Sequence, residues 1–145
     1  MKNMLRSKRA ISPILATLLL VVIAVAAIVV TYAWVMTYMN AQIAQAGVFL
    51  TEDTQSWLPN STIRLYVRNT GTSDATIDAV YIGTSSSNLD PQTSLTYDPP
   101  NGAVAAQGGL VSVTIDYSWS TGTTYYFKVV PKVGPPLEFN SRAQP

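Results

Sequence analysis

The sequence contains no cysteine and no histidine. The absence of cysteine excludes disulfide bonds and all chemistry that depends on a thiolate. Without cysteine and histidine, the common types of zinc site are also excluded. Catalysis with histidine as the general base is excluded as well. The two absences do not locate the protein, because both reducing and oxidising compartments contain chains of this kind.

Charge is also scarce, and its distribution is uneven. The formal net charge of the 145 residues is +1. Without residues 1–10, five basic and eight acidic residues would remain, a net charge of −3. The rest of the chain therefore offers no basic patch, and we expect no nucleic-acid partner. The basic residues of the N-terminal tip are Lys2, Arg6, Lys8 and Arg9.

Against this background, one long uncharged segment stands out. The 42 residues from Ala10 to Thr51 contain no charged side chain, and Ile11 to Met39 is almost wholly apolar. The segment is too long for a strand, and its apolar residues occupy every side of the implied helix. We therefore expect a helix from Ile11 to Ala46, with Pro13 in its first turn, where a missing N–H costs little. Such a helix must lie in lipid or inside a protein assembly.

The length of this helix leaves two interpretations open. Its 36 residues span about 54 Å at ~1.5 Å per residue, whereas the hydrocarbon core of a bilayer is about 30 Å thick. The helix is thus either a tilted single-span anchor or an element that also packs in a larger assembly. Small residues at Ala24, Ala27 and Thr31 permit close helix packing. The aromatic residues Tyr32 and Trp34, with Tyr38, equally fit an interfacial belt.

The segment "KRAISPILATLLLVVIAVAAIVV" closely resembles the N-terminus of archaeal type IV pilins. A secretory signal peptide fits less well, because its apolar region is only 7–15 residues long. The resemblance implies a class III signal peptide, cleaved by a prepilin peptidase between Ala10 and Ile11, with Lys8 and Arg9 as recognition residues. Bacterial pilins have glutamate at the fifth mature position, where this chain has Leu15, so a bacterial pilin is not indicated. The "ISP" start is more similar to adhesion-type pilins than to archaellins.

The resemblance also implies a function and a set of partners. The precursor would be held in the cell membrane, with its leader in the cytoplasm and its C-terminal domain outside. After cleavage, the helix would leave the lipid and form the core of an extracellular helical homopolymer. An assembly ATPase and a membrane platform protein would be the other partners. The residues expected to pack in the filament core are Ile11, Pro13, Leu15, Leu18, Val22, Ala24, Val25, Ala27, Val29, Thr31 and Trp34.

The remainder, residues 47–145, reads as a small β domain. Apolar and polar residues alternate with period two in several segments, which is typical of half-buried strands. Turn residues separate segments 62–69 and 75–83, so we expect a β-hairpin there. Five to seven short strands suit an immunoglobulin-like sandwich, giving an α+β lollipop of helical stalk and β head. The expected strands are 62–69, 75–83, 110–116, 123–134 and 136–141, with short ones around 95–97 and 104 in a loop region from 83 to 109.

Some residues of this domain suggest functions. Asn60 begins the only N-x-S/T sequon and is a candidate for glycosylation. The acids Asp90, Asp98 and Asp116 lack the close spacing of a calcium loop, and we expect them to be solvated. The aromatic residues could form a carbohydrate platform, but packing in the core or between subunits is the better interpretation. They are Tyr117, Trp119, Tyr125 and Tyr126.

No motif of an enzyme is present: the sequence has no nucleophile elbow, no phosphate-binding glycine loop and no marked carboxylate pair. We expect no enzymatic activity and no cofactor. Two alternatives to a major pilin stay open. One is a monomeric, membrane-anchored binding module with the same helix and the same β domain. The other is a minor pilin of a DNA-uptake or secretion system.

Overall fold

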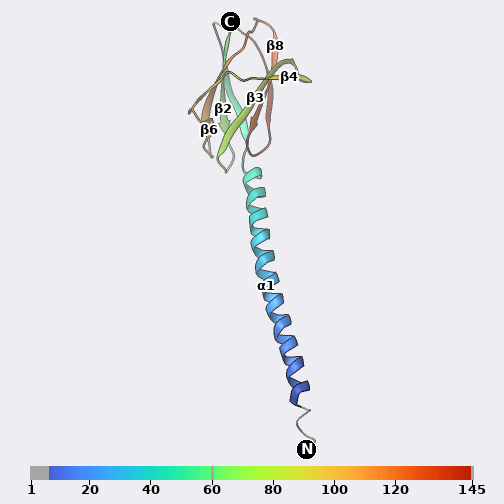
Figure 1. Cartoon of the computed structure of the whole chain (residues 1–145). Coiled ribbons are helices and arrows are strands. Elements are labelled where there is room, and N and C mark those ends of the chain that lie inside the picture. Colours follow the sequence, from blue (N-terminus) through green and yellow to red (C-terminus); the bar gives the residue numbers. More distant parts are fainter. Residues whose placement is uncertain (1–6, 60, 145) are drawn as a thin grey trace, which may run out of the picture. The chain divides into compact units, whose positions relative to one another are not determined.

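The structure is a computed structural model that describes residues 7–59 and 61–144, without the side chains of residues 7–12, 44 and 45. The chain divides into two compact units, residues 1–41 and 42–145. The described residues of the first unit, 7–41, belong to one long helix, α1 (Ser7–Ala46), whose residues 42–46 are part of the second unit. The helix begins four residues before Ile11, where we expected its start, so Pro13 lies inside it rather than in its first turn (Figure 1).

The second unit is built from two antiparallel sheets. The first sheet has the strand order β1-β2-β7-β5. Its inward residues face each other across the ladder, as in the pairs Ile63 with Ile115 and Leu65 with Val113. These strands are β1 (Leu50–Leu58), β2 (Thr62–Asn69), β7 (Gly109–Asp116) and β5 (Leu95–Asp98).

The second sheet has the order β4-β3-β8-β9, and a short strand, β6, pairs with the start of β3. Val80 faces Val129, and Ile82 faces Phe127 in the β3–β8 ladder. The inward residues of both sheets form one fully buried apolar core. These strands are β4 (Asn88–Pro91), β3 (Ala75–Ser85), β8 (Thr124–Pro131), β9 (Leu137–Arg142) and β6 (Ala103–Val104).

The order of the strands is that of an immunoglobulin-like sandwich. β1, β2, β7 and β5 take the places of strands A, B, E and D, while β3, β8 and β9 take those of C, F and G. A further hallmark is a tyrosine corner at the start of strand F. Here Tyr125 is the second residue of β8, and its hydroxyl accepts a hydrogen bond from the backbone N–H of Ser120 at 3.0 Å. The expected fold class, a long helix followed by an immunoglobulin-like β domain, is confirmed.

The expected β-hairpin between segments 62–69 and 75–83 is wrong. Both segments are strands, but β2 pairs with β1 and β7, whereas β3 pairs with β4, β6 and β8. The turn between them carries the chain from one sheet to the other, as the B–C connection does in immunoglobulin domains. Both strands bury one face in the same core. Their apolar and polar residues therefore alternate in the same way as those of two strands paired in a hairpin.

The described residues hold nine strands, more than the five to seven expected. Segments 110–116, 123–134 and 136–141 are strands, with the second ending at Pro131, and the short strands near 95–97 and 104 are present. The β1 strand was not predicted. Its register shifts by a bulge between Glu52 and Thr54, which interrupts the alternation that would have identified it. Most of its residues are half-buried or exposed, as suits an edge strand.

Candidate functional site

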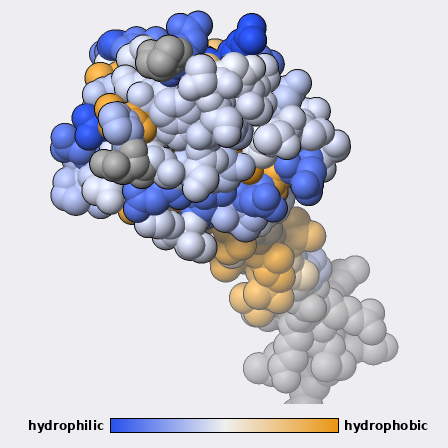
Figure 2. Space-filling model, turned by 90° about the horizontal axis from the view of Figure 1, so that it is seen from above, coloured by the Kyte–Doolittle hydropathy of each residue, from blue (hydrophilic) through white to orange (hydrophobic). Residues whose placement is uncertain are grey.

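The most distinctive surface of the molecule is the helix α1. Its stretch from Pro13 to Ile43 is long and apolar enough to cross a membrane, with a mean hydropathy of 3.1 in its most apolar 18-residue window, and is nowhere buried. Large apolar side chains are exposed on all its sides, with exposed fractions of 68% for Leu20 and 67% for Ile28. Figure 2 shows hydrophobic residues on the coloured part of the helix, whereas hydrophilic and neutral residues dominate the sandwich surface in this view. So large an exposed apolar surface indicates contact with lipid or with other proteins.

The hydroxyl groups of this helix are satisfied within it. Thr31 donates a hydrogen bond to the carbonyl oxygen of Ala27 at 2.8 Å, and Thr37 donates to that of Ala33 at 3.0 Å. Thr17 donates to the carbonyl oxygen of Ile14 at 2.9 Å. A hydroxyl that is buried without a partner costs free energy. Since these hydroxyls already have partners, the helix can enter a dry environment without that cost.

The residues expected to pack in a filament core are exposed along α1, as far as their side chains are described. One helix alone cannot bring them together, so their packing stays a prediction. Ile11 and the cleavage residues Lys8, Arg9 and Ala10 have helical backbones, but their side chains lie outside the described residues. The exposed ones are Pro13, Leu15, Leu18, Val22, Ala24, Val25, Ala27, Val29, Thr31 and Trp34.

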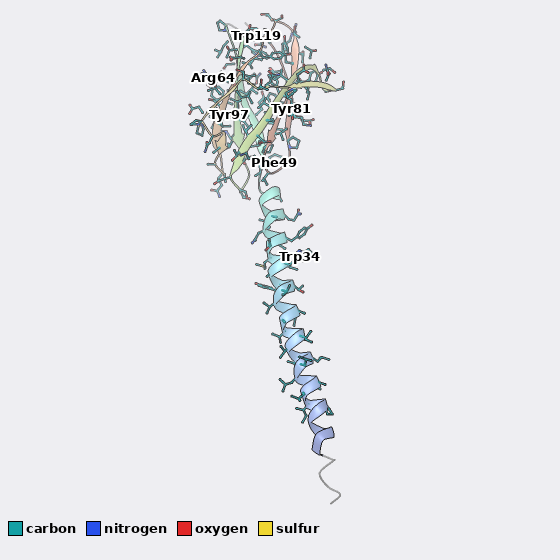
Figure 3. All side chains as sticks on the ribbon, viewed as in Figure 1. Trp34, Phe49, Arg64, Tyr81, Tyr97 and Trp119 are labelled. Atoms are coloured by element: carbon teal, nitrogen blue, oxygen red, sulfur yellow. The ribbon has the colours of Figure 1, made fainter. Side chains whose placement is uncertain are left out.

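Aromatic residues gather in the C-terminal third of the helix. The rings of Trp34 and Tyr38 stack with centroids 5.9 Å apart, and Tyr32, two residues before Trp34, is exposed. Figure 3 labels Trp34 on the helix. From Ile11 to Thr31 the helix rises about 30 Å, which is the thickness of the hydrocarbon core. An aromatic belt at the membrane interface would therefore begin at Tyr32, and the residues after it would stand outside the lipid.

The entry of the chain into the sandwich is fixed by backbone hydrogen bonds. The carbonyl oxygen of Gly47 accepts hydrogen bonds from the N–H groups of Thr72 at 2.7 Å and Ser73 at 3.0 Å. Gly71 lies so close that a β-carbon there would collide with the same carbonyl oxygen. The connection from β2 to β3 is thus held against residues 47–49, and a side chain at Gly71 has no room.

Asn69, which sequence reasoning missed, lies at the centre of this connection. It is fully buried, and its Nδ2 donates to the carbonyl oxygens of Ser73 at 2.8 Å and Val104 at 3.2 Å. Its Oδ1 accepts from the N–H of Gly71 at 3.0 Å and from that of Phe49 at 3.4 Å. The signal available in the sequence was an asparagine just before the turn residues T-G-T-S-D, a position where its side chain often bonds the backbone two residues on.

The aromatic residues of the sandwich belong mainly to its core. Trp57 is the centre of a cluster, with ring centroids 5.4 Å from Trp119 and 5.5 Å from Tyr125. The indole N–H of Trp119 donates to the carbonyl oxygen of Leu58 at 3.2 Å. Tyr117 packs edge-on against Tyr125 at 5.8 Å. Packing in the core, the interpretation favoured from the sequence, is therefore confirmed for Tyr117, Trp119 and Tyr125, while Tyr126 is half-buried on the opposite face of its strand.

The candidate acids stand at strand ends and are not gathered. Asp90, Asp98 and Asp116 are all exposed, and Asp116 accepts a hydrogen bond from the hydroxyl of Ser94 at 3.0 Å. In the part of the chain that the structure describes, no three acidic residues are placed to hold a metal ion. Asn60, the candidate for glycosylation, lies outside the described residues, so its prediction is untested.

A groove of about 780 Å³ lies between the edge strands β1 and β9. It is lined largely by apolar side chains, among them Phe49, Leu137 and Phe139, and Phe49 is 60% exposed. Glu52 lines the same groove, and partial burial raises the pKa of its carboxyl group. Outside the groove, the side-chain amide of Gln55 in β1 donates a hydrogen bond to the hydroxyl of Ser141 in β9 at 2.6 Å and so joins these two edge strands.

The sequence matches no protein-family model and no curated protein. Solved structures, however, share its fold. One is the archaeal flagellum of Methanospirillum hungatei strain JF1, with a TM-score of 0.76, 15% identity and coverage of 98% of this chain and 93% of that chain. With 98% of this chain covered, the similarity includes both the helix and the sandwich.

Two further structures come from Sulfolobus acidocaldarius. The archaellum periplasmic stator protein FlaG has a TM-score of 0.54, 20% identity and coverage of 65% of this chain and 99% of that chain. The stator complex of FlaF and FlaG has a TM-score of 0.53, 20% identity and coverage of 63% of this chain and 87% of that chain. At these identities the similarities establish a common fold and no more.

Proposed function

We propose that this chain is a structural subunit of an archaeal extracellular filament of the type IV pilus kind, which polymerises through α1. The adhesion-type pilus is the form we favour, with the β sandwich as the outer surface of the filament. The mature subunit begins at Ile11, after a prepilin peptidase has removed the leader with Lys8 and Arg9 at its recognition site. An assembly ATPase and a membrane platform protein extract the subunit from the membrane.

The observation that carries this proposal is the helix surface. A lipid anchor needs about 20 apolar residues, whereas Pro13 to Ile43 is a stretch of 31 exposed residues that are mostly apolar and carry no charge. The aromatic belt at Tyr32 and Trp34 accounts for a lipid-embedded state of the precursor. The uncharged turns beyond the belt have no use in an anchor, but they have one in a helical core. There, a buried unpaired charge would cost several kcal/mol per subunit.

Cleavage after Ala10 would also move Pro13 to a favourable position at the start of the helix. In the uncut chain α1 begins at Ser7, and Pro13 lies inside it, where proline removes a backbone hydrogen bond. In the mature chain Pro13 is the third residue. It then belongs to the first turn, where its missing N–H costs little and its fixed φ angle favours the helix.

The mechanism follows from these properties. The basic leader keeps the N-terminus in the cytoplasm while the β domain crosses the membrane. Loss of the leader frees the helix end to leave the bilayer, and helix–helix contacts then replace lipid contacts. The contacts are heterologous and do not close, so a helical filament forms rather than a ring. The structure of the flagellum of Methanospirillum hungatei is similar to this one over 98% of the chain, which supports a filament of this kind.

A second candidate function is a membrane-anchored component of such a machine that does not polymerise. The observation in its favour is the likeness of most of the chain to the stator protein FlaG and to its complex with FlaF. In this role α1 would stay in the membrane, and the sandwich would dock onto another protein. The apolar groove beside Phe49 would then be the natural contact surface.

N-terminal sequencing and intact mass of material sheared from cells separate these functions. A chain that begins at Ile11 in sheared filaments supports the filament subunit. A chain that is found only in the membrane fraction, whatever its first residue, contradicts that proposal and favours the anchored component. Electron cryo-microscopy of the same sheared filaments would then distinguish a pilus from an archaellum by the arrangement of the subunits.

A further inference from the structure

The outer face of the β1-β2-β7-β5 sheet carries a hollow of about 540 Å³. This volume lies within the range of ordinary ligand sites. In Figure 3, Arg64 and Tyr97, which both line it, lie on the left side of the sandwich, whereas Tyr81 of the other sheet lies to the right. The lining includes Arg64, Tyr66, Asp98, Leu110, Ser112 and Thr114.

The ladder arranges these side chains in rows across the sheet. In one row Arg64 of β2 faces Thr114 of β7, which faces Thr96 of β5. In the next row Tyr66 faces Ser112, which faces Asp98. The four strands of this sheet span about 14 Å, because neighbouring strands lie ~4.8 Å apart. The rows therefore present hydroxyl groups, one cation and one anion along a shallow strip.

The charged groups of this strip have unused hydrogen-bonding capacity. Arg64 donates only a long hydrogen bond of 3.4 Å to the hydroxyl of Thr114, and Asp98 has no partner for its carboxylate among residues 7–59 and 61–144. Neither belongs to the ion pairs of those residues. The neighbouring Arg68, by contrast, pairs with Asp53 at 3.1 Å and donates to the carbonyl oxygen of Gly108.

Apolar surface lies beside these polar groups. The half-buried ring of Tyr66 and the side chain of Leu110, which is 42% exposed, border the hollow. A sugar ring has one face of C–H groups and a rim of hydroxyls that both donate and accept hydrogen bonds. The C–H face fits an aromatic and aliphatic surface, while the hydroxyls fit a guanidinium, a carboxylate and serine and threonine hydroxyls together.

We propose that this strip, called the Arg64–Tyr66 strip, binds a neutral hexose oligosaccharide or polysaccharide. This inference rests on the proposed function, because it requires the sandwich to face the outside of the cell. An anionic sugar would gain from Arg64 but would be repelled by Asp98, so the balanced pair favours a neutral one. A protein partner is less suited, because the cores of protein interfaces are depleted of charged residues.

The test uses sheared wild-type filaments and three immobilised probes, cellohexaose, maltohexaose and mannohexaose, with binding measured by biolayer interferometry. We expect saturable binding to at least one probe. Tyr66→Ser should weaken it about tenfold or more, the scale on which a single aromatic contact acts. Thr114→Val keeps the shape of the side chain and tests the polar row without loss of the ring.

The matched control is Tyr81→Ser, which removes a half-buried tyrosine from the outer face of the other sheet. It should leave binding unchanged. Arg142→Gln likewise removes a cation outside the strip and should have no effect on binding.

Binding to none of the three probes, or an equal loss in Tyr66→Ser and Tyr81→Ser, would overturn the inference. So would a loss of filaments in Tyr66→Ser with a folded sandwich, since the strip would then be a contact between subunits. Filaments that assemble normally but bind no probe refute only the sugar site. A chain that binds the probe from detergent but never forms filaments refutes only the filament proposal.

Discussion

The side-chain amide of Asn69 donates a hydrogen bond of 3.2 Å to the carbonyl oxygen of Val104 and so joins β2 of one sheet to β6 of the other. The bond is buried, and all other polar atoms of the Asn69 side chain are also paired. A buried polar group with every partner in place specifies one arrangement of the backbone around it. Here that arrangement is the crossing from β2 to β3, the step that sequence reasoning mistook for a hairpin.

Asn69→Ala should lower the free energy of unfolding by about 2–3 kcal/mol, because it leaves buried backbone groups without partners. The measurement is urea unfolding of the full chain in detergent, followed by tryptophan fluorescence, to which Trp57 and Trp119 of the sandwich contribute. Asn140→Ala serves as the control, since Asn140 is exposed on β9. A loss for Asn69→Ala no larger than that of the control would contradict the role given to this amide.

The helix and most of the sandwich could be predicted because their patterns have a physical cause that acts locally. An uncharged segment of 42 residues admits few structures other than a helix in an apolar environment. Alternation in segments such as 62–69 arises because one face of each strand is buried. Where burial is partial, as in β1 with its bulge at Glu52, the pattern fades and the strand is missed.

The topology and the finer contacts could not be predicted in this way. Which sheet a strand joins depends on long-range contacts, such as those of Gly47 with Thr72 and Ser73. These contacts leave no periodic trace in the sequence. The Arg64–Tyr66 strip was missed for the same reason, because β2 is paired with β7, and Arg64 and Thr114 of these strands are 50 residues apart in the chain.

Tyr125→Phe tests the tyrosine corner. The variant keeps the buried ring but removes the hydroxyl that accepts the N–H of Ser120 at 3.0 Å. We expect a loss of about 1 kcal/mol in the free energy of unfolding, the usual net worth of one hydrogen bond. Tyr126→Phe removes a hydroxyl from the outward face of the same strand and should cost less. Equal losses in the two urea titrations would show that the corner adds no stability.

The carboxyl group of Glu52 should give the sandwich a small dependence on pH. Burial raises the pKa of Glu52 in the folded state, so its contribution favours folding most at low pH and is lost as the pH rises through that raised pKa. As the pH rises from about 3 to about 7, Glu52→Gln should therefore become more stable relative to the wild type. The gain should stay below about 0.5 kcal/mol, because the group is partly exposed and screened by solvent.

Thermal unfolding of both proteins at the two pH values measures this difference. Glu138→Gln is the comparison, because Glu138 lines the same groove but pairs with Lys128 at 2.8 Å. It should not be more stable than the wild type at neutral pH. If Glu52→Gln loses rather than gains relative stability as the pH rises, burial does not penalise this carboxylate.

Processing depends on the junction before the helix. Ala10→Asp or Arg9→Gln should leave the chain uncut, because the resemblance to archaeal type IV pilins makes a basic residue followed by a small one the recognition site. Intact mass of the protein from membranes measures the outcome, with the uncut chain heavier by residues 1–10. Lys2→Gln, at a basic residue remote from the junction, should be cut as in the wild type. A mature mass unchanged in Ala10→Asp would place the cut elsewhere.

Val25→Lys should abolish filaments while the sandwich stays folded. Val25 is exposed on α1, and in a helical core its side chain would be enclosed by other helices. A lysine there would bury an unpaired charge in every subunit, at a cost of several kcal/mol each, and the cost recurs along the whole polymer. Electron microscopy of sheared material measures assembly, and the urea transition of the sandwich in detergent checks folding. Val25→Leu keeps the site apolar and should form filaments. If Val25→Lys also forms normal filaments, Val25 is not enclosed in a dry core, and the proposal that the subunit polymerises through the packing of α1 is contradicted.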